Sequence, residues 1–400
     1  MSDARGFDEG ATMRRHWGLD EDVVFLNHGS FGACPLPVLA EQRAWRERLE
    51  AEPVRFFVRE YEDALDHAKA ELARFIGADA HDLAFVANAT TGVNTVLRSL
   101  ELRPGDELLI TDHAYGACRN ALEFVAARAG ATVRVARLPS PVGSSDAIVD
   151  AMLSEAGTRT RLALIDQITS PSAWVLPVDA LVEALQARGI DTLVDAAHAP
   201  GMVAMDLRAT GAAYTTGNCH KWLCAPKGAA FLHVRADKQA QIRPLVISHG
   251  ATAALAGRSR FELEHDWTGT SDPSAWLSVP SAIAFMGSLL PGGWPALRAR
   301  NHALACSARD RLLARLGTEA LCPREMLGSM AAVRVPALTE RPDSPPAPTD
   351  VDPLQERLWR DHRIEVPVQP SPGRPGERLL RVSTQAYTTM DDIQRLIDAL

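Results

Sequence analysis

Residues 107–138 read ELLITDHAYGACRNALEFVAARAGATVRVARL, and this stretch sets the expectation for the fold. It opens with an expected strand at 107–111, continues with a helical pattern at 117–129 and closes with a second expected strand at 132–138. Short apolar strands separated by helices are typical of a mostly parallel sheet that is buried on both faces. The stretch therefore predicts an α/β fold with right-handed, doubly wound connections.

The same alternation continues on both sides of this stretch. Upstream, an apolar strand is expected at 83–87, and a helix begins after residues 88–92. Further strands are expected downstream at 161–166, 192–195, 214–217 and 229–234. The repeated pattern predicts one sheet that is built from strand–helix–strand units.

The pattern changes after about residue 265, where long helical segments replace the short strands. We expect a large α/β domain over residues 26–270 and a small α+β domain over residues 271–400. The N-terminal arm, residues 1–25, is expected to pack on the small domain. Four prolines between 342 and 348 predict a surface loop over residues 336–352.

Composition and charge exclude several classes of protein. The 400 residues are 46% hydrophobic and 23% charged, which is typical of a globular protein with a large core. The net charge is −8 and no basic tract is present, so we expect no nucleic-acid partner. No apolar run has the length of a membrane span, and the first ten residues do not resemble a secretory signal, so we expect no membrane partner.

The cysteines point to a reduced compartment. Six cysteines in 400 residues are too few for a disulfide framework. Cys219 and Cys224 flank His220, but no second ligand pair follows at the spacing of a zinc site. We therefore expect a cytoplasmic protein without a metal.

Candidate functional residues follow the predicted strands, because ligands of an open α/β sheet bind beyond the carboxyl ends of its strands. Residues 88–92, Asn-Ala-Thr-Thr-Gly, begin a helix whose N–H groups could bind an anion, although the same residues serve as ordinary caps. Asp195 ends an apolar strand, where a buried carboxylate needs a cationic partner, although it could equally cap the next helix. Lys221 lies among apolar and aromatic neighbours, which would lower its pKa and make it a nucleophile, although a surface turn is an alternative.

The combination of these features is more specific than each of them. Pyridoxal 5′-phosphate (PLP) requires a lysine for its Schiff base, an acid at its ring nitrogen and an anion site for its phosphate. Asp195 can supply the acid, and Lys221 can supply the amine. Lys221 follows His220 and precedes a Pro-Lys-Gly turn at 226–228, and both candidates lie at or after strands that end at the same edge of the predicted sheet. The sequence therefore indicates PLP as the cofactor.

The chain resembles the class V aminotransferases, which are fold-type I PLP-dependent enzymes, and among them the isopenicillin N epimerase family. Seven motifs spread over nearly the whole chain carry the resemblance, and they are residues 25–32, 88–94, 112–115, 195–201, 216–228, 267–270 and 381–387. The resemblance implies the fold-type I architecture, with a large doubly wound domain and a smaller one.

The resemblance also implies roles for cofactor-binding residues. Lys221 would form the Schiff base, Asp195 would keep the ring nitrogen protonated, and His198 would lie near the ring oxygen. The residues implied to bind the phosphate are Ala89, Thr90, Asn218 and His220. Either Thr169 or Ser170 would supply a polar group near the ring oxygen.

Further roles concern the ring face, the substrate and the partner subunit. His113 or Tyr115 would stack on the ring, and His113 is also a candidate catalytic acid. Arg381 would bind the substrate carboxylate, and the 27–31 segment with Asn27 and His28 would contact the substrate. Thr270 would reach the phosphate of a second subunit, which implies a homodimer with a shared active site.

Three reactions at the α-carbon of an amino acid share these residues. We place epimerisation of an amino acid or amino-acid side chain first, with a C–S lyase or cysteine desulfhydrase second and an aminotransferase third. Cysteine desulfurases of this class need a cysteine shortly before the carboxylate-binding arginine, and residues 360–381 contain none. A nucleotide-binding α/β protein without PLP is disfavoured because neither G-x-G-x-x-G nor a P-loop follows a strand.

Overall fold

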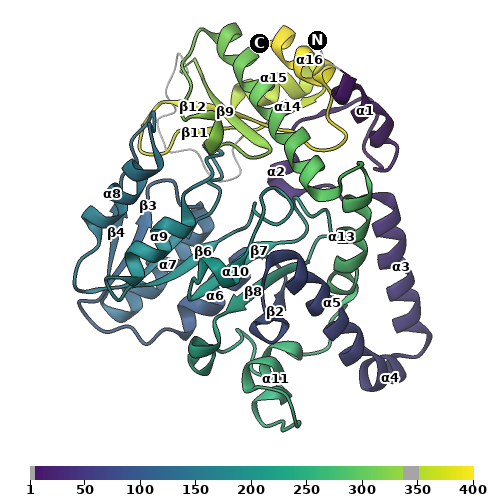
Figure 1. Ribbon diagram of the computed structural model, residues 1–400, viewed down its shortest axis with the longest axis vertical. Helices are drawn as coiled ribbons and strands as arrows, with labels where there is room; N and C mark the ends of the chain where they lie inside the picture. The colour runs from purple at the N-terminus through teal and green to yellow at the C-terminus, as the bar shows by residue number, and fades with distance from the viewer. Residues whose placement is uncertain (1–4, 337–350) are drawn as a thin grey trace.

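A seven-stranded sheet forms the centre of the molecule in the computed structural model, which describes residues 5–336 and 351–400 (Figure 1). The sheet order is β2-β8-β7-β6-β5-β3-β4. These strands are β2 (Leu83–Val86), β3 (Glu107–Thr111), β4 (Thr132–Ala136), β5 (Thr160–Asp166), β6 (Asp191–Asp195), β7 (Tyr214–Asn218) and β8 (Ala230–Val234). Strand β8 runs opposite to the other six strands of this sheet, which all point the same way, so the predicted α/β fold with a mostly parallel sheet is confirmed.

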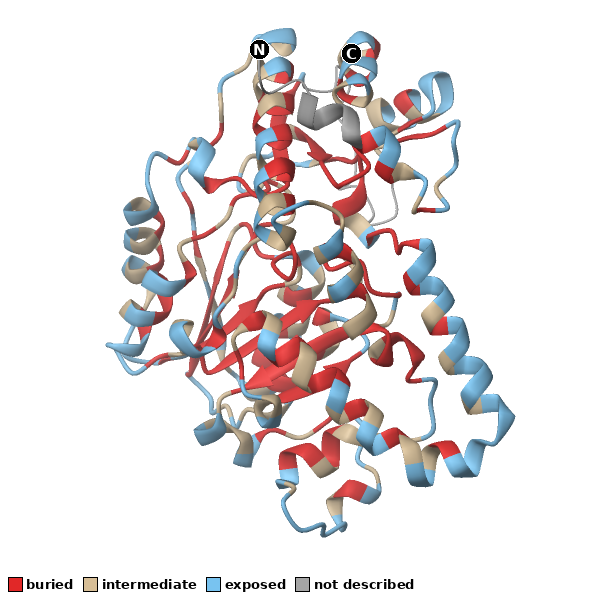
Figure 2. Cartoon of the chain, turned by 45° about the vertical axis from the view of Figure 1, so that its right-hand side comes forward, coloured by how far each residue is buried: buried red, intermediate tan, exposed pale blue. Residues whose placement is uncertain are grey.

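Helices cover both faces of this sheet, and its strands are buried except for the edge strand β4, in which Thr132 and Arg134 are exposed (Figure 2). The four helices are α6 (Ala89–Ser99), α7 (Gly116–Ala129), α8 (Ser145–Glu155) and α9 (Val178–Gln186). In β5, Leu162 and Leu164 share a core with α6 and α7, whereas Ala163 and Ile165 share one with α8 and α9. Alternate side chains of one strand thus point to opposite faces, which is why the strands read as continuous apolar runs.

A smaller antiparallel sheet lies at one end of the molecule (Figure 1). Its order is β11-β12-β9, and its strands are β9 (Met330–Val335), β11 (Val368–Pro370) and β12 (Arg378–Ser383). The helices that accompany it are α14 (Gly293–Leu316), α15 (Pro353–His362) and α16 (Met390–Ala399). The alternation of helices and antiparallel strands is that of an α+β layer.

The N-terminal segment joins this second layer. Strand β1 (Val24–Phe25) pairs in parallel with β10 (Ile364–Glu365), and α1 (Arg5–Arg14) packs on α14. The domain boundary at residue 270 stays a prediction, and α13 (Val279–Ser288), which lies beyond it, packs on helices of the large layer, α3 (Leu36–Ala51) and α5 (Tyr61–Ile76). Residues 1–4 of the expected arm and nearly all of the expected loop over 336–352 lie outside the described residues.

Short helices and turns complete the chain. The short α-helices are α2 (His28–Phe31), α4 (Pro53–Arg55), α10 (Leu207–Thr210), α11 (Arg260–Asp266) and α12 (Ser274–Leu277). A π-helical turn spans Phe56–Glu60, and 3₁₀ turns span Ala80–Asp82, Ala236–Gln241, His249–Ala251 and Arg324–Met326. Within residues 5–336 and 351–400, no single helix is long and apolar enough to cross a membrane, and Ser274–Ser288 with Gly293–Leu316 reaches that length only as a pair bent by 70°.

Candidate active site

A cavity of about 690 Å³ opens where β5, β6 and β7 end and α6 begins. These are the carboxyl ends of parallel strands, where ligands of open α/β sheets bind. The predicted site residues that line it are Ala89, Thr90, Tyr115, Ser170, Asp195, His198, Asn218, His220 and Lys221. The structure therefore brings together most of the residues that the sequence analysis selected.

Lys221 is partly buried and lines this cavity, with its amine 3.3 Å from Nε2 of His198. Burial, together with the nearby charge of Arg381, lowers the pKa of Lys221 to about 8. Burial also lowers the pKa of His198 well below its usual value, so its ring is neutral. The indole N–H of Trp222 donates to Nδ1 of His198 at 3.3 Å, which places the ring proton on Nε2, facing the lysine. Nε2–H of His198 can therefore donate a hydrogen bond to Nζ of Lys221, which accepts it only as a neutral amine. The neutral amine is the nucleophilic form.

Asp195 lies at the end of β6 and is only 3% exposed. Its Oδ1 accepts a hydrogen bond from the amide of Ala197 at 3.0 Å, and its Oδ2 accepts one from the thiol of Cys118 at 3.1 Å. Asp166 lies opposite Asp195 in the register of β5 and β6 and also lines the cavity. Burial raises the pKa of both carboxyl groups, so this wall of the cavity holds acids that a cationic group would stabilise.

The first turn of α6 forms the opposite end of the cavity. The side chain of Asn88 accepts the amide hydrogen of Thr91 at 2.8 Å, and that of Asn218 accepts the amide hydrogen of Ala89 at 2.8 Å. In the described chain the amide of Thr90 is left without such a partner, and Thr90 lines the cavity. An eleven-residue helix presents its positive end here, which suits an anion.

His220 lines the same cavity, between Asn218 and Lys221. Its Nδ1–H donates to the carbonyl of Ala229 at 3.1 Å, and burial lowers its pKa to about 4. The neutral ring therefore offers a lone pair on Nε2, and a bound phosphate would favour the protonated ring instead.

Arg381 of β12 is only 1% exposed and does not itself line the cavity, but it hydrogen-bonds two residues that do, Ser170 and Ser30. Its Nη1 donates to the carbonyl and the hydroxyl of Ser170 at 2.6 and 3.2 Å, and its Nη2 donates to the hydroxyl of Ser30 at 3.2 Å. Its Nε is buried without a partner, and among the described residues no carboxylate pairs with the guanidinium. A buried arginine without an anion favours the binding of a ligand carboxylate.

His113 and Thr169 lie behind the cavity wall rather than on it. Nδ1 of His113 is 2.7 Å from the hydroxyl of Ser172, which is 2.7 Å from that of Thr169. The ring of His113 packs on Trp174, with the ring centroids 4.5 Å apart. Of the two residues considered for stacking on the cofactor, Tyr115 is therefore the one that lines the cavity, and Ser170 rather than Thr169 does so.

Three further predicted residues also lie off the cavity wall. The amide of Asn27 donates to Glu365 at 2.9 Å, so this side chain joins the N-terminal segment to β10. His28 is completely buried behind Lys221 and does not line the cavity, and its substrate-binding role stays a prediction. Thr270 is exposed and lies in the loop after α11, outside this cavity.

The sequence reasoning missed Asp166, Cys118 and Ser30. Asp166 ends a strand just as Asp195 does, so the rule that selected Asp195 would have selected it too. Cys118 lies inside α7, and its contact with Asp195 depends on tertiary packing that no local pattern indicates. Ser30 lies in the 27–31 segment that was expected to contact the substrate, but its contact with Arg381 joins residues that are 351 positions apart.

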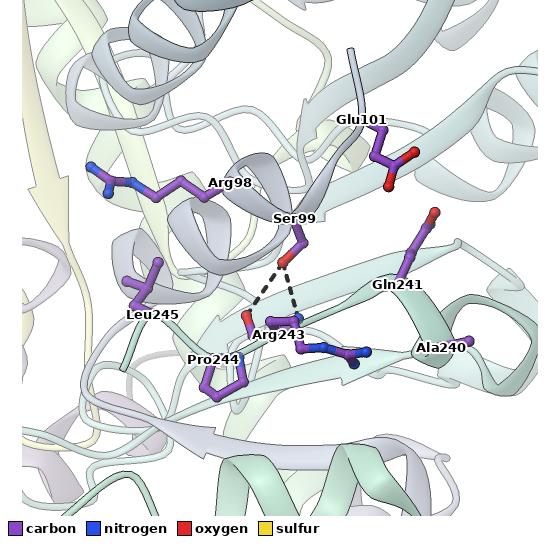
Figure 3. A pocket seen from close by; sticks show the side chains of 8 residues that line it. All are labelled: Arg98, Ser99, Glu101, Ala240, Gln241, Arg243, Pro244 and Leu245. Carbon is purple, nitrogen blue, oxygen red and sulfur yellow. Dashed lines mark hydrogen bonds between the residues drawn. The ribbon is translucent and has the colours of Figure 1, made fainter. Parts of the chain in front are cut away.

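A separate cavity of about 450 Å³ lies between the end of α6 and the segment 240–245 (Figure 3). Its lining comprises Arg98, Ser99, Glu101, Ala240, Gln241, Arg243, Pro244 and Leu245. Ser99 hydrogen-bonds the main chain of Arg243 there, and none of the predicted site residues takes part.

Comparisons with known proteins agree with this site. An isopenicillin N epimerase from Amycolatopsis lactamdurans is 38% identical to the chain, covering 98% of it and 97% of that protein. A protein described as a probable chloroplastic L-cysteine desulfhydrase from Arabidopsis thaliana is 34% identical, covering 95% of this chain and 83% of its own.

Solved structures share the fold. The cysteine desulfurase CsdA from Escherichia coli matches with a TM-score of 0.79 at 18% identity, covering 98% of this chain and 97% of that one. A mutant of C-DES with glycine covalently linked to its PLP cofactor matches with a TM-score of 0.77 at 19% identity. The match covers 96% of this chain and 98% of that one. The predicted fold-type I architecture is confirmed. The family model of class V aminotransferases matches residues 34–341, and the chain belongs to that family.

Proposed function

We propose that the protein is a PLP-dependent enzyme that acts at the α-carbon of an amino acid or an amino-acid side chain, as an epimerase of the isopenicillin N epimerase type. The observation that carries the proposal is the amine of Lys221, held 3.3 Å from His198 in one cavity with Asp195 and the first turn of α6. The similarity to isopenicillin N epimerases over nearly the whole chain supports the choice of reaction.

The residues that line the cavity fit PLP. When bound, PLP supplies an electron sink that stabilises negative charge at the α-carbon of an amino acid. Lys221 would hold the cofactor through Nζ, and Asp195 would accept the hydrogen bond of the ring nitrogen. The Thr90 amide and His220 would bind the phosphate, at the positive end of α6.

Arg381 would bind the α-carboxylate of the substrate. The guanidinium is held by Ser170 and Ser30, so its orientation is fixed before a ligand arrives. Its charge has no carboxylate partner in the described chain, and a substrate carboxylate would stabilise it through a two-point contact. The substrate would then lie between β12 and Lys221.

Lys221 would remove the α-proton, because its lowered pKa of about 8 leaves a far larger fraction of the amine neutral near physiological pH than in an ordinary lysine. Inversion requires a second acid on the opposite face of the substrate. Tyr115 lines the cavity, and burial raises the pKa of its phenol, so it keeps its proton. We assign the return of the proton to Tyr115, while His113 supports the wall through Ser172.

A C–S lyase of the cysteine desulfhydrase type is the second candidate, and the 34% identity to the Arabidopsis protein favours it. The same lysine, aspartate and arginine would serve, since a lyase also begins with removal of the α-proton. A persulfide-forming desulfurase is less compatible, because all six cysteines are buried and none lines the cavity. Aminotransfer remains a third reaction of the same residues.

The experiment that separates these reactions uses the purified protein with PLP and a panel of L- and D-amino acids. Chirality, pyruvate, sulfide and keto acid are measured in the same samples. An epimerase inverts the substrate in ²H₂O with deuterium at the α-carbon and forms none of the other products. Formation of pyruvate together with sulfide would contradict the epimerase and support the lyase. Formation of a keto acid without sulfide would contradict the epimerase and support the aminotransferase.

We propose that the enzyme is a homodimer with a shared active site. Large side chains are exposed at the mouth of the cavity, where Phe31, Tyr115 and Leu245 are 76%, 45% and 44% exposed. A second copy would cover them, and its Thr270, exposed and outside the cavity of its own chain, would reach the phosphate.

We also propose a cytoplasmic location. All six cysteines are free, which fits a reducing compartment. Fractionation of the source cells with antibody detection tests this, and recovery outside the cytoplasm would contradict it.

A further inference from the structure

The main chain of Lys221 is bound from behind by His28, whose side chain is completely buried. Nε2 of His28 lies 2.9 Å from the carbonyl oxygen of Lys221. Nδ1 of the same ring lies 2.8 Å from the hydroxyl of Tyr387. The ring therefore joins the loop that carries the lysine to the segment that follows β12.

The directions of both hydrogen bonds follow from the groups involved. A carbonyl oxygen only accepts, so Nε2 carries the ring proton and donates it to Lys221. Burial lowers the pKa of His28 to about 3, so the ring is neutral and its Nδ1 accepts. The hydroxyl of Tyr387 is then the donor to Nδ1, and a single tautomer satisfies all three groups.

The same carbonyl closes a strained turn. The amide of Cys224 donates to the carbonyl of Lys221 at 3.0 Å, and Cys224 has a φ of +62°, which is uncommon for a residue with a side chain. The two donors, from Cys224 and His28, occupy both lone pairs of the oxygen. Removal of the His28 donor would leave the turn held from one side only.

The segment 28–32 lies wedged between the lysine loop and β12. A Cβ on Gly32 would lie 2.0 Å from the carbonyl oxygen of His220 and 2.9 Å from Cα of Lys221. A Cβ on Gly29 would lie 3.1 Å from the hydroxyl of Ser383 and 3.4 Å from Nη2 of Arg381. The segment thus touches the backbone of Lys221 on one side and the guanidinium of Arg381 on the other.

We propose that His28 is a positioning residue, which fixes the backbone of Lys221 and, through Tyr387, ties it to the strand that carries Arg381. The inference rests on the proposed function, in which Lys221 is the reacting amine and Arg381 binds the substrate. In this role Nε2 of His28 donates to the main chain of Lys221, whereas the sequence analysis expected His28 to contact the substrate.

Two substitutions of similar size separate the two hydrogen bonds of His28. In His28→Gln, the amide nitrogen lies at the level of Nε2 and can still donate to the carbonyl of Lys221. In His28→Asn, the shorter side chain reaches only the level of Nδ1 and loses that donor. Tyr214→Phe is the control for the loss of a buried hydrogen bond away from the lysine loop. It removes a tyrosine hydroxyl that is bonded to Gln241 at the far end of β7.

The first measurement is hydrogen exchange of residues 219–225 in the full-length protein, with and without added PLP. We expect exchange in His28→Asn to be roughly tenfold faster than in the wild type, the effect of one lost hydrogen bond of about 1.4 kcal/mol. His28→Gln and Tyr214→Phe should stay near the wild type in this segment. Equal exchange in the Gln and Asn variants would overturn the proposal.

The second measurement is the rate at which PLP attaches to the protein, followed by visible absorbance over a pH series, because this rate depends on the free amine of Lys221. Burial lowers the pKa of Lys221, so a loosened backbone should admit water and move the midpoint upward in His28→Asn but not in His28→Gln. Borohydride trapping on Lys221 tests the proposed function separately. If borohydride traps the cofactor on Lys221, but His28→Asn changes neither the hydrogen exchange of residues 219–225 nor the midpoint of the pH series, the positioning role is refuted and the proposed function stands. If the cofactor is trapped on another residue, the proposed function is refuted.

Discussion

Lys221 and Lys227 line the same cavity, so they form a matched pair for substitution. The amine of Lys227 donates to the carbonyl of Gly32 at 3.0 Å, whereas that of Lys221 faces His198. Lys221→Ala should abolish the borohydride-stable cofactor adduct and leave the fold intact, while Lys227→Ala should keep the adduct. Peptide mass analysis after reduction measures this, and an adduct on Lys227 would contradict the assignment.

Asp195 offers a second test at the residue scale. Asp195→Asn keeps the shape of the side chain but removes the charge that would hold the ring nitrogen protonated, so turnover should fall by about a hundredfold. The cofactor should remain bound, with an altered visible spectrum. Cys118→Ala removes only one donor to Asp195 and should slow turnover about tenfold or less. Full activity in Asp195→Asn would show that the ring is not the electron sink.

Arg381 should shift the pH dependence of Lys221. The free amine is the reactive form, so the rate of covalent cofactor attachment should rise with pH up to about 8 and then level. The cation of Arg381 disfavours a second positive charge, and Arg381→Met should therefore raise the pKa of Lys221 and move the profile to higher pH.

Arg381→Lys is the control for this shift. It retains the charge but lacks the planar fork, so it should keep the profile and weaken binding of the substrate carboxylate. Attachment rates measured by absorbance over a pH series decide the question. A profile that stays in place in Arg381→Met would refute the electrostatic link.

At the scale of elements, α6 both stabilises the fold and presents the anion site. Asn88→Ala removes the cap on Thr91, which should lower the free energy of unfolding by about 1 kcal/mol and weaken PLP binding because the first turn frays. Ser144→Ala removes the cap of α8, away from the cavity, and should lower stability without changing PLP affinity. Chemical unfolding and cofactor titration of both variants test this, and equal affinities would contradict it.

Elements were predictable from the sequence where local patterns determine them. The apolar runs located the strands of the central sheet, and β7 extends one residue beyond the predicted end, to Asn218, which binds the first turn of α6. Long helical segments were expected after residue 265, but not the packing of α13 on α5, because the partner of an apolar face is a tertiary property. The pairing of β1 with β10 joins segments 340 positions apart, which no local pattern specifies.

At the scale of the whole molecule, the site was predictable where function restricts residue type. Lysine, aspartate and a small-residue helix start are required by one cofactor, so their order along the chain was informative. The placement of His28 was not predictable, because a histidine in a glycine-bearing turn looks the same whether it faces a substrate or the back of Lys221. Burial and hydrogen bonds to Tyr387 settle its position, and both depend on the packing of the second layer.

A shared site in a homodimer can be tested by mixing two inactive variants. If Thr270 of one subunit completes the phosphate site of the other, Thr270→Glu should inactivate its partner's site by placing a charge beside the phosphate. Mixing this variant with Lys221→Ala should give mixed dimers in which one site has both wild-type residues. Random reassortment makes half of all dimers mixed, so activity should return to about a quarter of wild type. The variant that carries both substitutions in one chain is the control, because mixing it with Lys221→Ala leaves no chain with a reactive lysine. No recovery in the first mixture, with mixed dimers demonstrated by mass, would place Thr270 outside the partner's site.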